Sequence, residues 1–438
     1  MIDRIVVENF KSLRRVELLL GRMNLFVGAN ASGKSNFLDV LRVLQGIGNG
    51  FTISEILDGK PRSATSAVWD GIRGGSRRAC FAGVGDNEDV TIEVHGRFAG
   101  GPLQKWLGSE KRRSDGEPAL SWELLVAFSP TAGCVTRERF KVAKVIYDTD
   151  GIDGFPQKDP KLPVWCPIEG AQGWSVRLQR TRPALGQLAR GQWQHGIDST
   201  EDFEHLKRSE GARAYYMDQS RGVARLFANI QRVEPESSML RAYAQVPEVQ
   251  RMGDHGENFA ALVRTICKDN SAKDAYLSWL RQLRPEEIDD VGVRQGAMGE
   301  PLFVLRENGR EFPAVVLSDG TLRFAALAAA FFQPDMPNLM AIEEIENGIH
   351  ANRARLLLEL LRSQSAAAKT QVVATTHSAT VLDWLGEEDY GTTFVCRRDE
   401  TTGESTICAL ADVPHFKDIV KTRPVSELLS EGWLEAAL

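Results

Sequence analysis

The sequence predicts an α/β protein in which a mixed sheet with flanking helices is joined to an antiparallel β subdomain and a compact helical insert. Three observations predict this class. Residues 23–44 read as a buried strand, a glycine-containing loop and a helix, and residues 90–178 contain short runs of alternating apolar and polar side chains. Helical spacing dominates residues 185–290, and strands alternate with helices again from Pro301. The expected parts are an N-terminal lobe at 1–184, the insert at 185–295 and a C-terminal lobe at 296–438.

The N-terminal lobe should begin with three strands, because apolar and β-branched residues are grouped in short runs there. A helix follows the loop and should stop at the glycines of 46–50. A short helix and a basic glycine turn come next. The expected elements are strands at 2–8, 16–20 and 23–27, helices at 36–44 and 53–58, and a turn at 71–75.

The next part of the chain changes from extended to helical patterns. Glycine, proline and aspartate separate the extended runs, which indicates an antiparallel meander. The helical segments lack a sustained heptad repeat, so we expect a compact insert without coiled-coil arms. The expected strands are at 90–95, 121–128, 139–147, 164–168 and 174–178, and the clearest helices are at 222–230, 256–267 and 271–283.

The C-terminal lobe returns to alternating strands and helices. A turn at Asn308-Gly309 should join the first two strands, because this dipeptide is typical of hairpins. A helix is expected to end the chain. The expected strands are at 302–306, 314–317, 338–342, 370–375 and 393–397, and the expected helices are at 321–332, 351–364, 379–386 and 425–438.

Composition limits the classes of function. The 438 residues suffice for two or three domains or one large α/β unit with insertions, and a net charge of −6 disfavours general coating of nucleic acid but permits a local basic groove. The six cysteines form no C-x-x-C pair, which gives no local support for a zinc ribbon and suits a reducing compartment. No apolar run approaches membrane-spanning length and no signal segment is seen, so a cytoplasmic protein without a membrane partner is expected.

The segment from Gly28 to Ser35 fits G-x-x-x-x-G-K-[S/T], the phosphate-binding loop, in the strand–loop–helix context that the motif needs. Its glycines allow successive main-chain N–H groups to face phosphate oxygens, and the helix N-terminus adds partial positive charge. Lys34 would reach the β- and γ-phosphates, and the Ser35 hydroxyl would hold Mg²⁺. The predicted ligands are therefore ATP and Mg²⁺. The predicted ATP-binding residues are Gly28, Asn30, Gly33, Lys34, Ser35 and Asn36.

Three further segments carry candidate site residues. An apolar strand ends in Glu343-Glu344, and in phosphate-loop ATPases such acids bind the Mg²⁺ shell and polarise the attacking water. Ser318 and Gly320 stand at a helix start, where they could bind an anion, although an ordinary N-cap is the simpler alternative. His377 follows another buried strand and could contact the γ-phosphate, or it is a structural histidine.

The order of these motifs resembles that of ABC-type ATPase heads of the RecF/SMC class. It is most similar to a prokaryotic branch that includes OLD-like ATPases and many anti-phage defence ATPases. Residues 7–13 look like the opening strand and turn of that class, 343–350 look like its Walker B and D-loop segment, and 426–434 look like the tail of the branch. The resemblance covers about 1–50 and 300–438, and leaves the middle third unassigned.

The resemblance implies a homodimer in which two heads enclose two ATP molecules. Ser318 and Gly320 would then cap, in trans, the γ-phosphate on the partner's loop, Glu344 would be the catalytic base and His377 the γ-phosphate sensor. Glu343 stands where many relatives have Asp, as a Mg²⁺ ligand. Thr321 replaces the usual Gln of the signature, which puts that contact in doubt, and the glutamine of the Q-loop is not assigned.

Three hypotheses follow for the role of the ATPase. In the first, ATP-driven dimerisation is a switch for a separate effector, such as a nuclease or toxin, in anti-phage defence, because the segment after His377 is too short for the nuclease domain of OLD-like proteins. The alternative is a RecF-like repair protein that binds DNA directly. A transporter subunit is disfavoured by the inserts. The basic and aromatic residues that would form the DNA groove are Arg177, Arg180, Arg182, Arg190, Trp174 and Trp193.

Overall fold

Segments from distant parts of the sequence combine into two units. The computed structural model describes residues 1–60, 69–82, 88–98, 120–142, 144–149, 161–168, 171–191, 210–350, 353–367 and 370–438. Unit 1 comprises Met1–Leu20, Ala31–Ile230 and Arg397–Ile407, and unit 2 comprises Gly21–Asn30, Gln231–Cys396 and Cys408–Leu438. The three-part division by sequence remains a prediction. Among the described residues, no helix is long and apolar enough to cross a membrane.

Unit 1 is built on an eight-stranded sheet with the order β2-β1-β4-β5-β6-β7-β8-β9. Neighbouring strands are antiparallel, which confirms the predicted meander and extends it to the first two strands. The strands are β1 Ile2–Phe10, β2 Leu13–Leu19, β4 Val90–Phe98, β5 Leu120–Ser129, β6 Cys134–Val142, β7 Lys144–Asp148, β8 Lys161–Ile168 and β9 Ala171–Gln179. The helices of this unit are α1 Lys34–Gly48, α2 Ile53–Asp58, the 3-10 turn η1 Ser76–Arg78, α4 Ala184–Ala189 and α6 Glu210–Ala228.

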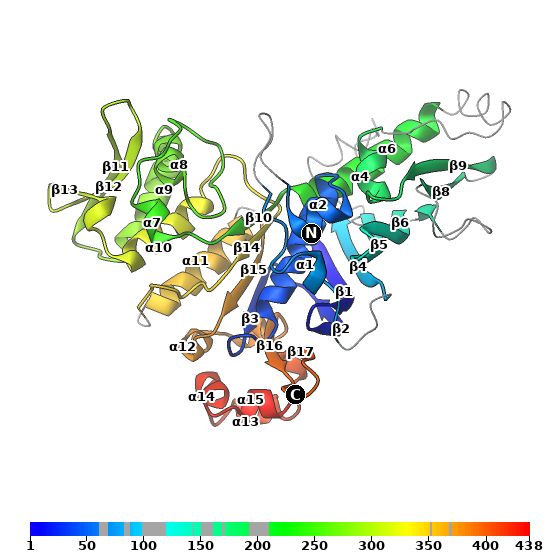
Figure 1. Ribbon diagram of the computed structural model, residues 1–438. Coiled ribbons are helices and arrows are strands. Elements are labelled where there is room, and N and C mark those ends of the chain that lie inside the picture. Colours follow the sequence, from blue (N-terminus) through cyan, green and yellow to red (C-terminus); the bar gives the residue numbers. More distant parts are fainter. Residues whose placement is uncertain are drawn as a thin grey trace. The chain divides into compact units, whose positions relative to one another are not determined.

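A six-stranded sheet with the order β10-β14-β15-β3-β16-β17 lies at the centre of unit 2 (Figure 1). β14, β15, β3 and β16 run parallel to one another. β14, β15 and β3 are buried throughout, as expected for parallel strands covered on both faces. The strands are β3 Met23–Val27, β10 Ile230–Val233, β14 Leu339–Ile342, β15 Gln371–Thr376, β16 Thr393–Arg398 and β17 Ser405–Ala409.

The rest of unit 2 is a three-stranded antiparallel sheet and a set of helices around one apolar core. Phe259 and Phe303 stack in that core with ring centroids 4.7 Å apart. The strands are β11 Ile288–Gln295, β12 Pro301–Glu307 and β13 Arg310–Pro313. The helices are α7 Ser237–Leu240, α8 Phe259–Ile266, α9 Asn270–Arg281, α10 Asp319–Ala330, α11 Ala354–Ala367, α12 Ala379–Leu382, α13 Phe416–Ile419, α14 Val425–Ser430 and α15 Trp433–Ala436, with 3-10 turns η2 Ala314–Val316, η4 Glu387–Asp389 and η5 Leu410–Asp412.

Several expected elements were wrong in type or extent. The predicted strand at 314–317 is a 3-10 turn, because Asn308 and Gly309 both have positive φ and the hairpin returns at once as β13. The predicted tail helix is broken at Gly432, whose φ of 73° is left-handed. β10, β11 and β17 were missed, and residues 230–233 extend as a strand where a helix was expected to end.

Candidate nucleotide-binding site

Three neighbouring parallel strands end at one edge of the unit 2 sheet (Figure 1). Ile342 of β14 pairs with Ala374 of β15, and Thr376 of β15 pairs with Val27 of β3. The residues that follow these strands are Glu343, His377 and Gly28. The carboxyl edge of a parallel sheet is where open α/β folds bind ligands, so the phosphate-binding loop starts beside the acids and the histidine.

The first residues of the loop belong to unit 2. Gly28 is buried, and Ala29 and Asn30 are exposed. The N–H group of Ala29 points to Oε1 of Glu435 in the tail, at 3.4 Å. A carboxylate therefore faces a main-chain N–H group of the loop, as expected for a segment that binds anions.

The second half of the loop belongs to unit 1 and leads into α1. Gly33 has φ of 110°, and a methyl group there would lie 2.5 Å from Oγ of Ser405, so the position requires glycine. α1 begins at Lys34, whose side chain is buried with Nζ 3.5 Å from Oγ of Ser32. The local geometry is that of a loop closed onto a helix N-terminus, as the motif predicts.

Polar contacts in unit 1 fix the first turn of α1. Nδ2 of Asn36 donates to Oγ of Ser12 at 2.6 Å, and Oγ of Ser405 donates to the same atom at 2.7 Å. Nη2 of Arg73 donates to the carbonyl of Ser35 at 2.9 Å. The Asn36 side chain therefore anchors the loop to β2 through its neighbour Ser12, and a direct contact of Asn36 with ATP stays a prediction.

Glu343 directly follows β14 and is buried. Its Oε2 lies 3.1 Å from Nη2 of Arg232, and the guanidinium offsets the charge of this carboxylate. Carboxylate and hydroxyl oxygens are the donors that Mg²⁺ prefers, so Glu343 and Ser35 fit this ion by their chemistry. A metal ion at Glu343 would share the carboxylate with Arg232.

Glu344 has φ of 48°, in the left-handed region that residues with side chains rarely adopt. Two contacts from β15 hold this conformation. The N–H of Glu344 donates to Oγ1 of Thr375, and the N–H of Ile345 donates to the carbonyl of Thr375, both at 3.0 Å. Such strain persists only where surrounding contacts impose it, and it is found most often at functional sites.

The segment predicted to be the signature forms the start of α10. Ser318 caps this helix by accepting the N–H of Thr321 at 3.3 Å, which is the N-cap that the sequence allowed as the simpler alternative. A methyl group at Gly320 would lie 2.4 Å from the carbonyl oxygen of Gly348 in the D-loop segment. A hydrogen bond from Arg241 holds the pKa of Asp319 below its usual range. These contacts leave the predicted role in trans open.

Arg323 connects α10 to the two acids. Its Nη2 donates to the carbonyls of Glu343 and Glu344, both at 3.1 Å, and its Nη1 donates to the carbonyl of Pro235 at 3.2 Å. The side chain is buried, and this burial lowers the pKa of the guanidinium, although Glu234, Glu344 and Glu346 oppose the shift. A movement of the signature helix would therefore be transmitted to the main chain of the acids.

His377 follows β15 and contacts a third acid. Oε1 of Glu346 accepts the main-chain N–H of His377 at 2.7 Å and lies 2.9 Å from its ring Nδ1. All these groups belong to unit 2. We call Glu343, Glu344, Glu346 and His377 the edge cluster.

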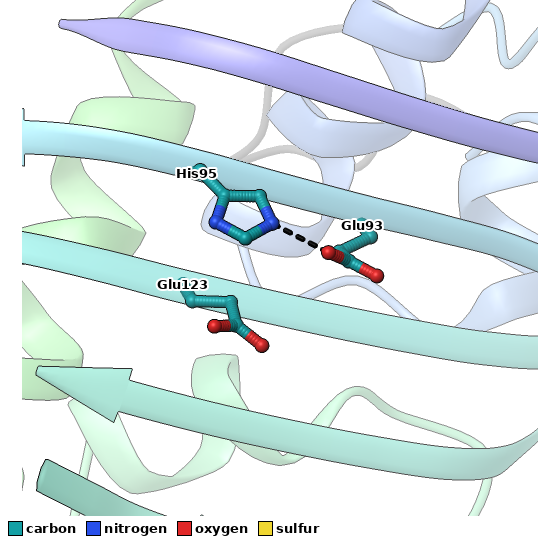
Figure 2. Close-up of side chains that lie close together, drawn as sticks. All are labelled: Glu93, His95 and Glu123. Atoms are coloured by element: carbon teal, nitrogen blue, oxygen red, sulfur yellow. Dashed lines mark hydrogen bonds and ion pairs between the residues drawn. The ribbon is translucent and has the colours of Figure 1, made fainter. Parts of the chain in front are cut away.

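A second group of carboxylates and a histidine lies on the unit 1 sheet, and we call Glu93, His95 and Glu123 the sheet-face cluster (Figure 2). Their ligand atoms lie within 4.8 Å of one another, with Nε2 of His95 2.5 Å from Oε1 of Glu93. Nη1 of Arg4 lies 3.0 Å from that carboxylate oxygen and 2.7 Å from Nε2 of His95. Arg139 pairs with Glu123 at 3.0 Å. Arginine nitrogens are therefore already bound to the side-chain atoms that a metal ion would need as ligands.

The residues proposed for a DNA groove are partly used inside unit 1. Arg180 donates to the carbonyl of Val135, Arg182 donates to that of Gly50, and Arg190 donates to that of Gly186. Trp193 and the side chain of Trp174 lie outside the described residues. Arginines whose donors are bound to main-chain carbonyls have less capacity left for phosphates.

Four residues in the edge cluster or in contact with it were not singled out from the sequence: Glu346, Thr375, Arg232 and Arg323. Glu346 and Thr375 stand next to motif residues, so a closer reading of the E-E-I-E and T-T-H-S segments could have found them. Arg232 lies 111 residues from its partner Glu343, and no local pattern signals such a contact.

Parallel strands that lead into a phosphate-binding loop, paired acids and a histidine are the arrangement expected of a P-loop ATPase. Two family models match the chain. The model described as "AAA ATPase domain" matches residues 1–60, and the model described as "AAA domain, putative AbiEii toxin, Type IV TA system" matches residues 196–383. Both descriptions name an AAA domain, so the two matched segments are similar to ATPase domains of that type. No curated protein matches the sequence.

Similar solved structures include three SMC heads. The SMC head domain from Thermotoga maritima is 15% identical, with a TM-score of 0.41 over 93% of this chain and 98% of that chain. An SMC head bound to the C-winged helix domain of ScpA is 13% identical, with a TM-score of 0.47 over 93% and 98%. An SMC head with an extended coiled coil, bound to the C-terminal domain of ScpA derived from Pyrococcus furiosus, is 11% identical, with a TM-score of 0.43 over 96% and 99%.

Proposed function

We propose that the chain binds ATP with Mg²⁺ on the loop from Gly28 to Ser35 and hydrolyses it with the edge cluster. One observation carries the proposal. The loop starts from β3, and the edge cluster follows β14 and β15, which are parallel neighbours of β3 in one sheet. A triphosphate on the loop would thus extend along the edge that carries the acids and the histidine.

In the proposed reaction, Glu344 accepts a proton from a water molecule whose oxygen bonds to the γ-phosphorus. The bond from that phosphorus to the β–γ bridging oxygen breaks, and ADP leaves with the electron pair. Lys34 and His377 hold γ-phosphate oxygens as charge develops on them. Ser35 and Glu343 would hold Mg²⁺, which supplies charge stabilisation when bound. The strained main chain of Glu344 would hold its carboxylate at the reacting edge.

We further propose that ATP binding closes a homodimer and that this closure is a switch for a separate effector in anti-phage defence. Ser318 and Gly320 would complete the partner's site. The contacts of Arg323 support the switch, because they join the signature helix to the main chain of Glu343 and Glu344. One matched family description names a toxin of a toxin–antitoxin system, which supports an effector of that kind. A cytoplasmic location stays a prediction.

ATP turnover and dimerisation test the proposal. Lys34→Ala should abolish ATP binding and turnover, while the exposed control Lys421→Ala should match the wild type. Glu344→Gln should accumulate an ATP-bound dimer, measured by light scattering after gel filtration, because ATP stays uncleaved. The matched control Glu400→Gln, at an exposed position, should behave as the wild type. Turnover by Lys34→Ala at the wild-type rate would overturn the site assignment.

Direct binding of DNA remains the alternative prediction. A protein that neutralises several phosphates loses affinity steeply as salt rises. Titration of labelled DNA at low and physiological salt separates the two functions. Absence of binding at low salt would remove DNA as a direct ligand, and a steep salt dependence that Arg177→Ala reduces would favour it.

A further inference from the structure

We propose that Glu346 is a positioning residue for His377, and that it determines which ring nitrogen the histidine offers to the γ-phosphate. The inference rests on the proposed function, in which His377 contacts that phosphate. One carboxylate oxygen of Glu346 binds both the main-chain N–H and the ring Nδ1 of His377. Within the part of the chain that the structure describes, these are the contacts of the histidine, so Nε2 is the nitrogen left for a ligand.

The loop around Glu346 is itself fixed by main-chain hydrogen bonds. The N–H of Asn347 donates to the carbonyl of Glu344 at 2.9 Å, and the N–H of Ile349 donates to the carbonyl of Glu346 at 2.8 Å. The Glu346 side chain is 12% exposed, whereas the His377 side chain is 47% exposed. The acid is thus the buried member of the pair, and the ring is the member that solvent or a ligand can reach.

Because the two nitrogens of a neutral imidazole differ in protonation, this contact determines which ring nitrogen of His377 carries the proton. An ionised carboxylate only accepts hydrogen bonds, so Nδ1 must carry a proton when it binds Glu346. The protein thereby selects the Nδ1–H form and turns Nε2 away from the acid. A histidine without this partner can rotate or exchange its two nitrogens. The expected benefit is a sensor that needs no reorganisation when ATP binds.

The second oxygen of Glu346 makes the inference testable with a near-isosteric change. Both residues line a cavity of about 210 Å³ whose other walls include Ile349, Leu357 and Val381. Oε2 of Glu346 is buried and makes no hydrogen bond within the described part of the chain. Glu346→Gln can therefore keep an oxygen toward both N–H donors of His377 and place its NH₂ group at the Oε2 position. Glu346→Ala removes both contacts.

Kinetics of four variants measure the coupling. Glu346→Ala should lower kcat roughly 10- to 100-fold with KM for ATP nearly unchanged, whereas Glu346→Gln should stay within about threefold of wild type. His377→Ala should lower kcat by a similar factor. The double variant Glu346→Ala/His377→Ala should be no slower than His377→Ala alone, because the acid acts through the ring. Additive losses in the double variant would overturn the positioning role.

A spectroscopic measurement separates this role from a merely structural one and from the proposed function. Nitrogen NMR of the full chain with ¹⁵N-labelled histidine reports which ring nitrogen carries the proton, and the His377→Ala spectrum assigns the signal. The wild type and Glu346→Gln should show protonated Nδ1, and Glu346→Ala should lose this preference. An unchanged tautomer in Glu346→Ala would overturn the inference. If His377→Ala hydrolysed ATP at the wild-type rate, the proposed role of His377 in hydrolysis would be wrong. The spectrum would still show whether Glu346 determines which ring nitrogen of His377 carries the proton.

Discussion

The sheet-face cluster and the edge cluster bring carboxylates and a histidine together in two different ways. In the sheet-face cluster the side chains project from adjacent antiparallel strands (Figure 2). Arginines from the neighbouring strands pair with the acids, as Arg4 pairs with Glu93. In the edge cluster the residues follow the ends of parallel strands, and the main-chain N–H groups of Glu344 and His377 donate to side-chain oxygens of Thr375 and Glu346. The first arrangement follows from cross-strand spacing and the second from the topology of the sheet.

The difference shows that residue type alone does not distinguish a cluster with a structural role from a cluster that binds a ligand or catalyses a reaction. The acids of the sheet-face cluster have cationic partners, so their charges are already matched. In the edge cluster Glu344 is strained and Glu346 keeps a buried oxygen without a partner among the described residues. Backbone strain and an unmatched acid oxygen in the same cluster, at the carboxyl edge of a parallel sheet, together indicate where a ligand is expected.

The largest expected difference concerns the removal of one carboxylate charge from each cluster. Glu344→Gln should lower ATP turnover about 100- to 1000-fold, because the amide cannot accept the proton of the attacking water. Glu123→Gln should leave turnover within about twofold of wild type, because this acid pairs with Arg139 and Lys141 on the sheet of unit 1. Steady-state phosphate release measures both. A comparable loss in Glu123→Gln would remove the distinction between the clusters.

A third carboxylate, Glu138 in β6, extends the comparison to a buried structural acid. It accepts hydrogen bonds from the Tyr147 hydroxyl at 2.5 Å and from the N–H groups of Ala184 and Leu185 at 2.6 and 2.7 Å. Glu138→Gln would set an NH₂ group against these donors, so it should lower the free energy of unfolding by about 2 kcal/mol near neutral pH. Urea unfolding measures the loss, and ATP turnover at 25 °C should not change.

The pH dependence of stability sharpens the prediction for Glu138. Burial raises the pKa of this carboxyl from 4.5 to about 7, and the hydrogen bonds that it accepts oppose the shift. A raised folded-state pKa gives stability that is fully present below about pH 4.5 and is lost as pH rises through about 7, in total roughly 3 kcal/mol. Between pH 5 and 7.5 the wild type should therefore lose more unfolding free energy than Glu138→Gln. An equal loss in both proteins would show that Glu138 does not titrate in this range.

The sequence predicted the features that depend on neighbouring residues. It did not predict the contacts between residues that are far apart in the sequence. The meander, β3 and the loop were predicted, because alternation and the glycine spacing are local signals. The partner strand after Asn308-Gly309 was misplaced, because both residues take positive φ and the strand resumes immediately. The contacts of Arg232 and Arg323 with the acids could not be predicted, since they depend on the order of the strands.

Substitution of two buried threonines on the parallel sheet tests whether the hydrogen bond from the Glu344 N–H to Thr375 contributes to kcat. Thr375→Val removes the acceptor of the Glu344 N–H and should lower kcat roughly tenfold, because the strained main chain would relax. Thr393→Val is the matched control, since the Thr393 hydroxyl is buried without a hydrogen-bond partner among the described residues. This control should keep its turnover and its melting temperature. Equal kcat values for the two variants would show that Glu344 needs no support from β15.

The smallest expected effect is that of zinc on the sheet-face cluster. Its atoms are close enough to ligate an ion, but Arg4 lies within 3.0 Å of both Glu93 and His95. A divalent cation placed there would have to displace the guanidinium, at an electrostatic cost that three partly exposed ligands do not offset. Calorimetric titration of the wild type with zinc should therefore show no stoichiometric binding that His95→Ala removes. Arg4→Ala should increase affinity for zinc at this cluster, because it frees one oxygen of Glu93 and Nε2 of His95 together. Tight binding by the wild type, lost in His95→Ala, would make the sheet-face cluster a metal site and reverse the contrast with the edge cluster.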